Sequence, residues 1–268
     1  MEQVGEILDE YREFLPLTNR QIFYRMVGAY GYPKHPVPGC GRPYNALCEH
    51  LVRARRAGMI PFDAIRDDGA TESAPVAWGG LGDLHAAWRE SARRYRRDRQ
   101  EGQPERLEVW CEAAGMVPQL ARVAHEYGVP VFSSGGFDSL TAKYDAAVRS
   151  VNADAPTVVL HVGDHDLSGR HIFRAAAEDV AALATGIDPG LLPPEFVRVA
   201  VTAEQVALYG LETREDDHAV QAEALAPDQL ATELLMAIMA RQDVDARARV
   251  TTLEAKERAE AILSLDDL

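Results

Sequence analysis

Apolar residues in the first hundred positions recur at the three- and four-residue intervals of helices. The pattern predicts three helices, over residues 3–14, 18–29 and 44–57. The second starts with a capping box, in which Thr18 and Gln21 can each bond the other's backbone amide. The third ends in a basic group, and an extended segment follows it. This order of short helix, turn, basic helix and extended segment is typical of a winged helix-turn-helix, which sets a helix against DNA.

From residue 107 onward, short apolar runs alternate with helical patterns. The run at 157–162 is rich in β-branched residues and is typical of a strand buried on both faces of a parallel sheet. Strands are predicted over 107–111, 129–133, 157–162 and 196–201, and helices over 118–127, 139–151, 171–184 and 203–209. Such alternation predicts an α/β fold with a parallel sheet and right-handed crossovers. The segment from about 216 is acidic and mostly helical, which favours a packing or dimer element over a catalytic one.

The amino-acid composition indicates the class of protein and the cellular compartment. The 268 residues are 47% apolar, an ordinary share for a globular chain, with no run as long as a membrane span and no signal-peptide pattern. Three cysteines, Cys40, Cys48 and Cys111, form no CxxC pair, so a reducing cytoplasm is expected. A zinc site built from Cys40 and Cys48 with His35 and His50 fits no standard spacing.

The net charge of −14 is unevenly distributed. Residues 1–100 hold 15 Lys+Arg and 13 Asp+Glu, a balance of +2, which leaves 13 and 29, a balance of −16, for residues 101–268. A basic face can bind DNA phosphates even on an acidic protein, because charges beyond a Debye length of about 10 Å are screened. Arg53, Arg55 and Arg56 are the candidate DNA contacts. A second group, for which pairing with neighbouring acids is the alternative, comprises Arg89, Arg93, Arg94, Arg96, Arg97 and Arg99.

Two aspartates follow the predicted strand at 157–162. If the chain stays extended past Gly163, Asp164 and Asp166 point to the same side. Carboxylate oxygens suit Mg²⁺, and the carboxyl edge of an open α/β sheet is where such folds bind ligands. Glu112 ends the first predicted strand and reaches the same edge if the two strands are neighbours. The alternatives are a solvated Asx turn for the aspartates and a helix cap for the glutamate.

These motifs resemble a known family. Glu112, followed 52 residues later by Asp164-His165-Asp166-Leu167-Ser168-Gly169, resembles the Toprim signature of a glutamate and DxDxxG. Toprim domains occur in topoisomerases, bacterial primases and certain nucleases, and use Mg²⁺ at phosphodiesters. The run Thr18–Tyr24 resembles the winged-helix motif of the topoisomerase VI A subunit, in which an Arg-x-Ile-aromatic-Tyr segment ends in the DNA-cleaving tyrosine. A winged helix followed by Toprim is that family's arrangement, and the resemblance covers roughly residues 15–210.

The resemblance implies a Mg²⁺-dependent DNA-cleaving transesterase, with Mn²⁺ as a substitute ion. Tyr24 would be the nucleophile and form a 5′-phosphotyrosyl link, and Arg20, one helical turn earlier, would stabilise the phenolate or the attacked phosphate. Asp164 and Asp166 would hold the metal together with Glu112, which could also transfer a proton. On this interpretation residues 1–100 form the winged-helix DNA-binding and cleavage domain, 101–215 the Toprim metal-binding domain, and 216–268 an acidic helical tail.

The family also implies partners. Its substrate is double-stranded DNA, and it sets the tyrosine of one subunit against the metal of another, so a homodimer is expected. The chain has only 23 residues before Tyr24 and no P-loop, so it looks like a reduced, stand-alone form, and any GHKL-type ATPase subunit would be encoded separately. The expected location is the cytoplasm, in association with the nucleoid.

Two other functions stay open. In a Toprim hydrolytic nuclease, water attacks and the winged helix only grips DNA. A non-catalytic DNA-binding subunit would bind DNA in a salt-sensitive way without cutting it. The tyrosine also has a structural alternative, because Tyr24 borders a helical apolar stripe of Phe23, Met26, Val27 and Tyr30.

Overall fold

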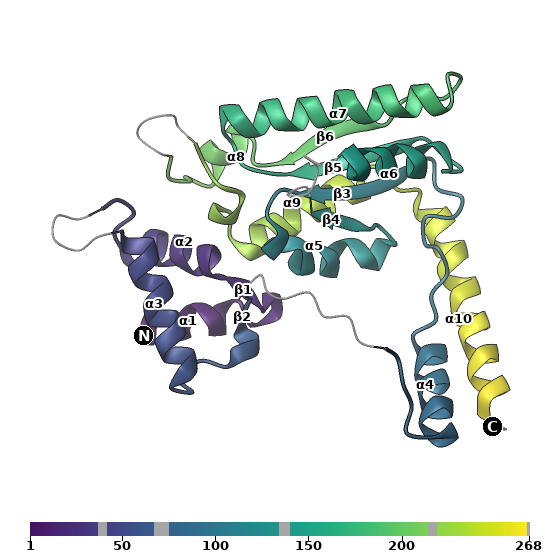
Figure 1. The fold of residues 1–268 in the computed structure, drawn as a ribbon, viewed down its shortest axis with the longest axis horizontal. Helices are drawn as coiled ribbons and strands as arrows, with labels where there is room; N and C mark the ends of the chain where they lie inside the picture. The colour runs from purple at the N-terminus through teal and green to yellow at the C-terminus, as the bar shows by residue number, and fades with distance from the viewer. Residues whose placement is uncertain (37–41, 67–74, 134–139, 214–218, 267–268) are drawn as a thin grey trace.

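The computed structural model describes residues 1–36, 42–66, 75–133, 140–213 and 219–266, with the side chains of residues 167–170, 172 and 266 outside the description. It is an α/β structure with two parallel sheets, a two-stranded one near the N-terminus and a four-stranded one that organises the rest (Figure 1). The α/β fold with a parallel sheet, expected from the alternating pattern, is therefore confirmed. No described helix is both long and apolar enough to cross a membrane.

The N-terminal part is a small helical bundle closed by two short strands. Its elements are α1 (Glu2–Glu10), η1 (Arg12–Phe14), β1 (Leu17–Thr18), α2 (Asn19–Tyr30), α3 (Pro43–Arg56), η2 (Phe62–Ala64) and β2 (Ile65–Arg66). The capping box predicted for α2 is present, because Gln21 N donates to Thr18 Oγ1 at 3.1 Å and Thr18 N donates to Gln21 Oε1 at 2.9 Å. Ile7, Leu17, Ile22 and Leu51 are almost fully buried between the helices. The three predicted helices are therefore confirmed, except that the first ends at Glu10 and the 3-10 turn η1 occupies the last part of its predicted range.

The segment after α3 differs from its prediction. The sequence predicted an extended piece beginning at Ile60, but a 3-10 turn, η2, precedes the two-residue strand β2. Pro61 has no amide to offer a sheet, and Phe62 is 65% exposed, so little would be gained by a longer strand here. β2 pairs with β1 in parallel, which ties this segment to the entry of α2.

The main sheet has four parallel strands in the order β4-β3-β5-β6. They are β3 (Arg106–Cys111), β4 (Val131–Ser133), β5 (Thr157–Val162) and β6 (Glu195–Ala200). The chain places β4 on one side of β3 and the later strands on the other, so the strand order reverses between β3 and β5. Open α/β sheets bind ligands at such a switch point, outside the carboxyl ends of the strands. The ends of β3 and β5 are thus the place to look for a site.

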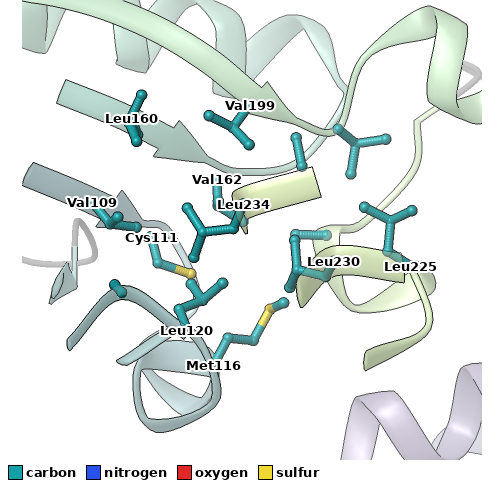
Figure 2. Packing of buried hydrophobic residues seen from close by; sticks show 14 of the residues in the cluster. Val109, Cys111, Met116, Leu120, Leu160, Val162, Val199, Leu225, Leu230 and Leu234 are labelled. Atoms are coloured by element: carbon teal, nitrogen blue, oxygen red, sulfur yellow. The ribbon is translucent and has the colours of Figure 1, made fainter. Parts of the chain in front are cut away.

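Helices cover both faces of this sheet. On one face, α5 (Val117–Ala124) and α9 (Pro227–Met239) enclose the largest apolar cluster, which includes Leu160, Leu230 and Leu234 (Figure 2). On the other, α6 (Leu140–Val151) and α7 (Leu167–Ile187) cover Trp110 and Val159 (Figure 1). Leu230, Leu234 and Ile238 are completely buried, which confirms the packing role expected for their stripe. After β6 comes the short helix α8 (Ala203–Leu208), and η6 (Ala222–Ala224) precedes α9.

Two helices far apart in sequence project together from the sheet domain. α4 (Leu81–Arg93) packs beside α10 (Val244–Asp266) (Figure 1). Ion pairs fix their base: Arg99 lies 2.9 Å from Glu254 and 3.0 Å from Glu126, and Arg97 lies 2.6 Å from Glu257. The second arginine group of the sequence is therefore largely paired with acids, as the alternative held. Arg93 and Arg94 pair with the neighbouring Glu90, whereas Arg97 and Arg99 also pair with acids of α10.

We expect Glu254→Gln to lower the free energy of unfolding by about 2 kcal/mol at pH 7, because the charged bond to Arg99 is lost from a buried position. The bond from Arg99 holds the pKa of Glu254 below its usual value. Its stabilisation is therefore complete above the unfolded pKa of about 4.3 and is lost as the pH falls through the lower folded pKa. Urea unfolding should show that the difference in unfolding free energy between the wild type and Glu254→Gln is smaller in acid than at pH 7. Glu260→Gln, at an exposed pair on the same helix, should change little.

Candidate active site

Glu112 and Asp164 meet at the switch point of the main sheet. Glu112 follows β3 and Asp164 lies two residues beyond β5, and the last residues of these strands, Cys111 and Val162, are register partners. The amide of Asp164 donates to Glu112 Oε2 at 2.6 Å. No side chain caps the 3-10 helix η3 (Ala114–Met116) that follows Glu112, so the helix-cap alternative does not hold. The sequence correctly predicted that the two carboxylates share one edge.

The chain stays extended after β5, as the same-side argument required. Gly163 continues the pairing with β6 through bonds of 2.8 Å to Ala200 and Val201. His165 then forms an antiparallel bridge with Val220, with N–O distances of 2.7 and 3.0 Å. Asp164 and Asp166, on either side of this bridge, line the same cavity. The expectation that they point to one side is confirmed.

Burial and mutual repulsion raise the pKa values of the carboxyl groups at this edge of the sheet. Burial raises the pKa of Glu112 and of Asp164, and Asp166 raises both further. A third buried carboxylate lies nearby: Glu223 is 6% exposed, and burial together with Asp164 raises its pKa. The positive charge of Arg20 lowers the pKa values of Asp164 and Glu223 and so partly offsets these increases. Negative charge is thus crowded into a partly desolvated place, where a divalent cation would relieve it.

The carboxylates are suitable ligands for a hard cation, but they do not form a complete coordination site as they stand. Among the side chains that the structure describes, no three His, Cys, Asp or Glu groups converge closely enough to hold an ion as they stand. Glu112 and Asp164 each direct one oxygen to a backbone amide, that of Asp164 and that of Ala222 at 2.9 Å. Mg²⁺ needs only one or two carboxylates and fills its octahedron with water or phosphate oxygens. In chemical type, the carboxylate oxygens at this edge are therefore donors that suit Mg²⁺ or Mn²⁺.

Two residues on β5 and β6 support this edge from within the sheet. Arg198 Nη2 donates to the carbonyl of Gly163 at 2.9 Å and also to that of Asp164. His161, its register partner, stacks on Phe173 with ring centroids 4.1 Å apart, and burial lowers the pKa of His161 to about 3, so the ring is neutral. The sequence analysis missed both, although a charged residue inside the apolar strand β6 was a usable signal.

Gly163 leaves no room for a side chain. A Cβ here would lie 2.5 Å from His161 Cε1 and 2.6 Å from Glu112 Cδ. We expect Gly163→Ala to displace the Glu112 carboxylate, to weaken Mn²⁺ binding in a calorimetric titration, and to cost about 1–3 kcal/mol of stability. Gly186→Ala, in α7 with nothing within 4 Å, should bind Mn²⁺ normally and be slightly more stable. Unchanged Mn²⁺ affinity in Gly163→Ala would contradict the placement of Glu112 in the site.

A cavity of ≈ 260 Å³ joins the N-terminal helices to the sheet edge. It brings the two sequence motifs together, since Tyr24 and Arg20 line it along with Asp164 and Asp166. The family resemblance implied a tyrosine set against the metal of another subunit, whereas here one chain supplies both. Among the residues that the structure describes, its lining comprises Arg20, Phe23, Tyr24, Lys34, His35, Tyr44, Asp164, Asp166, Ala219, Val220 and Gln221.

Tyr24 is half-buried at the wall of this cavity. Its hydroxyl donates to Gln221 Oε1 at 2.8 Å. Its ring lies edge-on to Phe23, with centroids 5.5 Å apart, and packs against both large apolar clusters. Lys34 Nζ stands 5.9 Å from the ring centroid. The ring therefore borders the core, as the structural alternative held, and Tyr24 also lines the cavity.

The predicted basic residues divide between the cavity and a distant surface. Arg20 is exposed, and its guanidinium lies 5.8 Å from the ring centroid of Tyr44. Arg53, Arg55 and Arg56 lie at the far end of α3, roughly 14–18 Å along the helix axis from Tyr44 at about 1.5 Å per residue. Arg53 pairs with Glu49 at 3.4 Å, Arg55 donates to the carbonyl of Phe62 at 3.1 Å, and Arg56 is exposed.

Two minor expectations fall partly outside the structure. Of the four residues considered for zinc, Cys40 lies outside the described residues, and Cys48 and His50 lie on α3. The side chains of Leu167, Ser168 and Gly169, which complete the DxDxxG motif, are likewise outside the description.

Comparison of the chain with protein-family models, curated proteins and solved structures finds no match. The function of the site is therefore argued from its own geometry.

Proposed function

We propose that this protein is a Mg²⁺-dependent DNA-cleaving transesterase of the topoisomerase VI A-subunit type, with Tyr24 as its nucleophile. The observation that carries the proposal is the cavity shared by Tyr24, Arg20, Asp164 and Asp166. A nucleophile, a cation for the phosphate and a pair of metal-binding carboxylates face one space, and they come from segments that are 140 residues apart. This grouping is what phosphoryl transfer requires.

In the proposed reaction the Tyr24 oxygen attacks a backbone phosphorus. A new O–P bond forms, the P–O3′ bond breaks, the phenolic proton passes to water, and the leaving 3′ oxygen takes up a proton. The product is a 5′-phosphotyrosyl link, which the 3′ hydroxyl can reverse. Arg20 stabilises the charge on the phenolate or the phosphate. A phenol has a pKa near 10, so this help matters at neutral pH.

Asp164 and Asp166 would hold the metal, with Glu112 beside them. The ion, when bound, supplies Lewis-acid stabilisation of the charge that grows on the phosphate. We assign Glu112 to completing the metal site or to transferring a proton. Burial raises its pKa, which is the direction that a carboxyl used in proton transfer needs.

The proposal extends to the fold and the partners. We take the N-terminal helices as a winged helix that grips double-stranded DNA, with Arg53, Arg55 and Arg56 as phosphate contacts, and the four-stranded sheet as a Toprim fold. Because the proposed reaction uses one nucleophile per chain, Tyr24, cutting both strands of a duplex requires a second copy, so we propose a homodimer. Any GHKL-type ATPase subunit would be a separate protein, and the cytoplasmic nucleoid is the proposed location.

Hydrolysis is the second candidate, and one observation favours it. The hydroxyl of Tyr24 already donates to Gln221, and its ring packs in the core, as in a structural tyrosine. In that case water attacks the phosphate, and the same carboxylates hold the metal that activates it.

Cleavage of supercoiled plasmid with Mg²⁺ or Mn²⁺ separates the two candidates. The reaction is stopped with SDS and analysed with and without proteinase K. Transesterification predicts nicked or linear DNA that enters the gel normally only after proteinase K. Cleaved DNA indifferent to proteinase K would indicate the hydrolytic nuclease, and DNA binding without cleavage under either metal would indicate a non-catalytic subunit.

A further inference from the structure

Residues 219–222, here called the strap, connect the tyrosine to the aspartates. Val220 forms the two-bond bridge with His165, between Asp164 and Asp166. The amide of Ala222 donates to Asp164 Oδ1 at 2.9 Å. Between these two anchors, Gln221 Oε1 accepts the hydroxyl of Tyr24 at 2.8 Å. Three successive residues of one short segment therefore fix both halves of the candidate site.

We propose that Gln221 is a positioning residue that sets the Tyr24 hydroxyl relative to the metal-binding aspartates. The inference rests on the proposed transesterase function and adds a residue to it. The hydrogen bond to Gln221 Oε1 fixes the direction of the Tyr24 O–H bond, and with it the orientation of the phenolic oxygen toward an incoming phosphate. An amide oxygen is too weak a base to keep the proton, so Gln221 orients the nucleophile and the proton leaves to water.

The anchors on either side make this orientation specific. The strap is held to the aspartate loop by backbone bonds from Val220 and Ala222, so Gln221 has little freedom to shift relative to Asp164. A displacement of about 1 Å in a reacting group can cost about 10²-fold in rate. Losing the Gln221 bond should therefore slow the attack without changing how DNA is held, because DNA contacts come from other parts of the cavity and surface.

The test measures single-turnover adduct formation on a nicked DNA duplex, with the DNA affinity measured separately. Gln221→Leu should lower the maximal adduct rate about 10²-fold and leave the DNA Kd within about twofold. Gln221→Glu keeps an acceptor, so it should form the adduct, with a new dependence on pH as the introduced carboxylate ionises. Gln242→Leu is the matched control, because Gln242 donates to the Tyr127 carbonyl at 3.3 Å, outside the cavity lining.

Thermal unfolding provides a readout that does not depend on cleavage. Gln221→Leu and Tyr24→Phe delete the same hydrogen bond, so the double variant should lose no more in melting temperature than the more affected single variant. Additive losses would overturn the inference, as would a wild-type adduct rate in Gln221→Leu or an effect confined to the DNA Kd. In those cases the transesterase proposal stands as long as the wild type forms an adduct. A wild type that forms no adduct overturns both.

Discussion

Tyr24→Phe is expected to abolish the covalent protein–DNA adduct, with a loss of at least about 10³-fold in its rate of formation. The substitution removes the only atom that attacks in the proposed reaction. It keeps the ring that packs between the two apolar clusters and deletes the hydrogen bond to Gln221. The folded state should lose only about 1 kcal/mol. The measurement is an SDS-resistant adduct assay on radiolabelled duplex, alongside thermal unfolding.

The matched control for this variant is Tyr30→Phe. Tyr30 lies on the same helix, and its hydroxyl donates to Glu6 outside the cavity lining. We expect it to form the adduct at the wild-type rate. If Tyr24→Phe cuts DNA as well as the wild type does, the tyrosine is structural and water is the nucleophile.

Asp164→Asn is expected to reduce metal-dependent cleavage by about 10³-fold. The amide oxygen can keep the bond to the Ala222 amide, so the change removes charge with little change of shape. Stabilisation by a bound metal is worth several kcal/mol, and about 1.4 kcal/mol corresponds to a tenfold change in rate. Cleavage and Mn²⁺ affinity should fall together.

The stability of Asp164→Asn shows whether its loss of cleavage comes from the reaction itself or from a loss of folded protein. Burial and Asp166 raise the pKa of Asp164, so at pH 7 its charge costs folding free energy in the metal-free protein. The neutral variant should therefore be at least as stable as the wild type without metal. Asp188→Asn is the control, since that side chain accepts the amide of Gly190 at 2.9 Å in the same way at an exposed position. Normal cleavage by Asp164→Asn would rule out the proposed metal site.

Local chemistry made much of the fold predictable. Thr18 and Gln21 lie three residues apart and mark the start of α2 in the sequence itself. The apolar run at 157–162 ends at Gly163, so the position of Asp164 at the end of a strand needed no long-range information. The position of Glu112 was harder to predict from the sequence, because its place beside Asp164 depends on the order of the strands in the sheet. That order followed only from the assumption that the two strands are neighbours, which the pairing of β3 with β5 confirms.

The parts of the site that the sequence did not predict depend on contacts between distant segments. Gln221 and Glu223 lie near Asp164 because α9 packs on the sheet and positions the residues that precede it. No local sequence pattern predicts this contact between segments that are distant in the chain. The acidic, helical character of this region favoured a packing or dimer element. Glu223 gave a faint signal, as a single charge in an otherwise apolar run of alanine and leucine.

Tyr24 lines the same cavity as Asp164 and Asp166, and we propose that it becomes linked to DNA there. Identifying the linked residue decides whether Tyr24 is the nucleophile. Trypsin cuts after Arg20 and Arg25, so the peptide Gln21–Arg25 contains Tyr24 as its single tyrosine. After cleavage of DNA, nuclease trimming and trypsin digestion, mass spectrometry should find this peptide carrying a nucleotide on its tyrosine. A nucleotide on any other peptide, or cleaved DNA with none attached, would contradict the account.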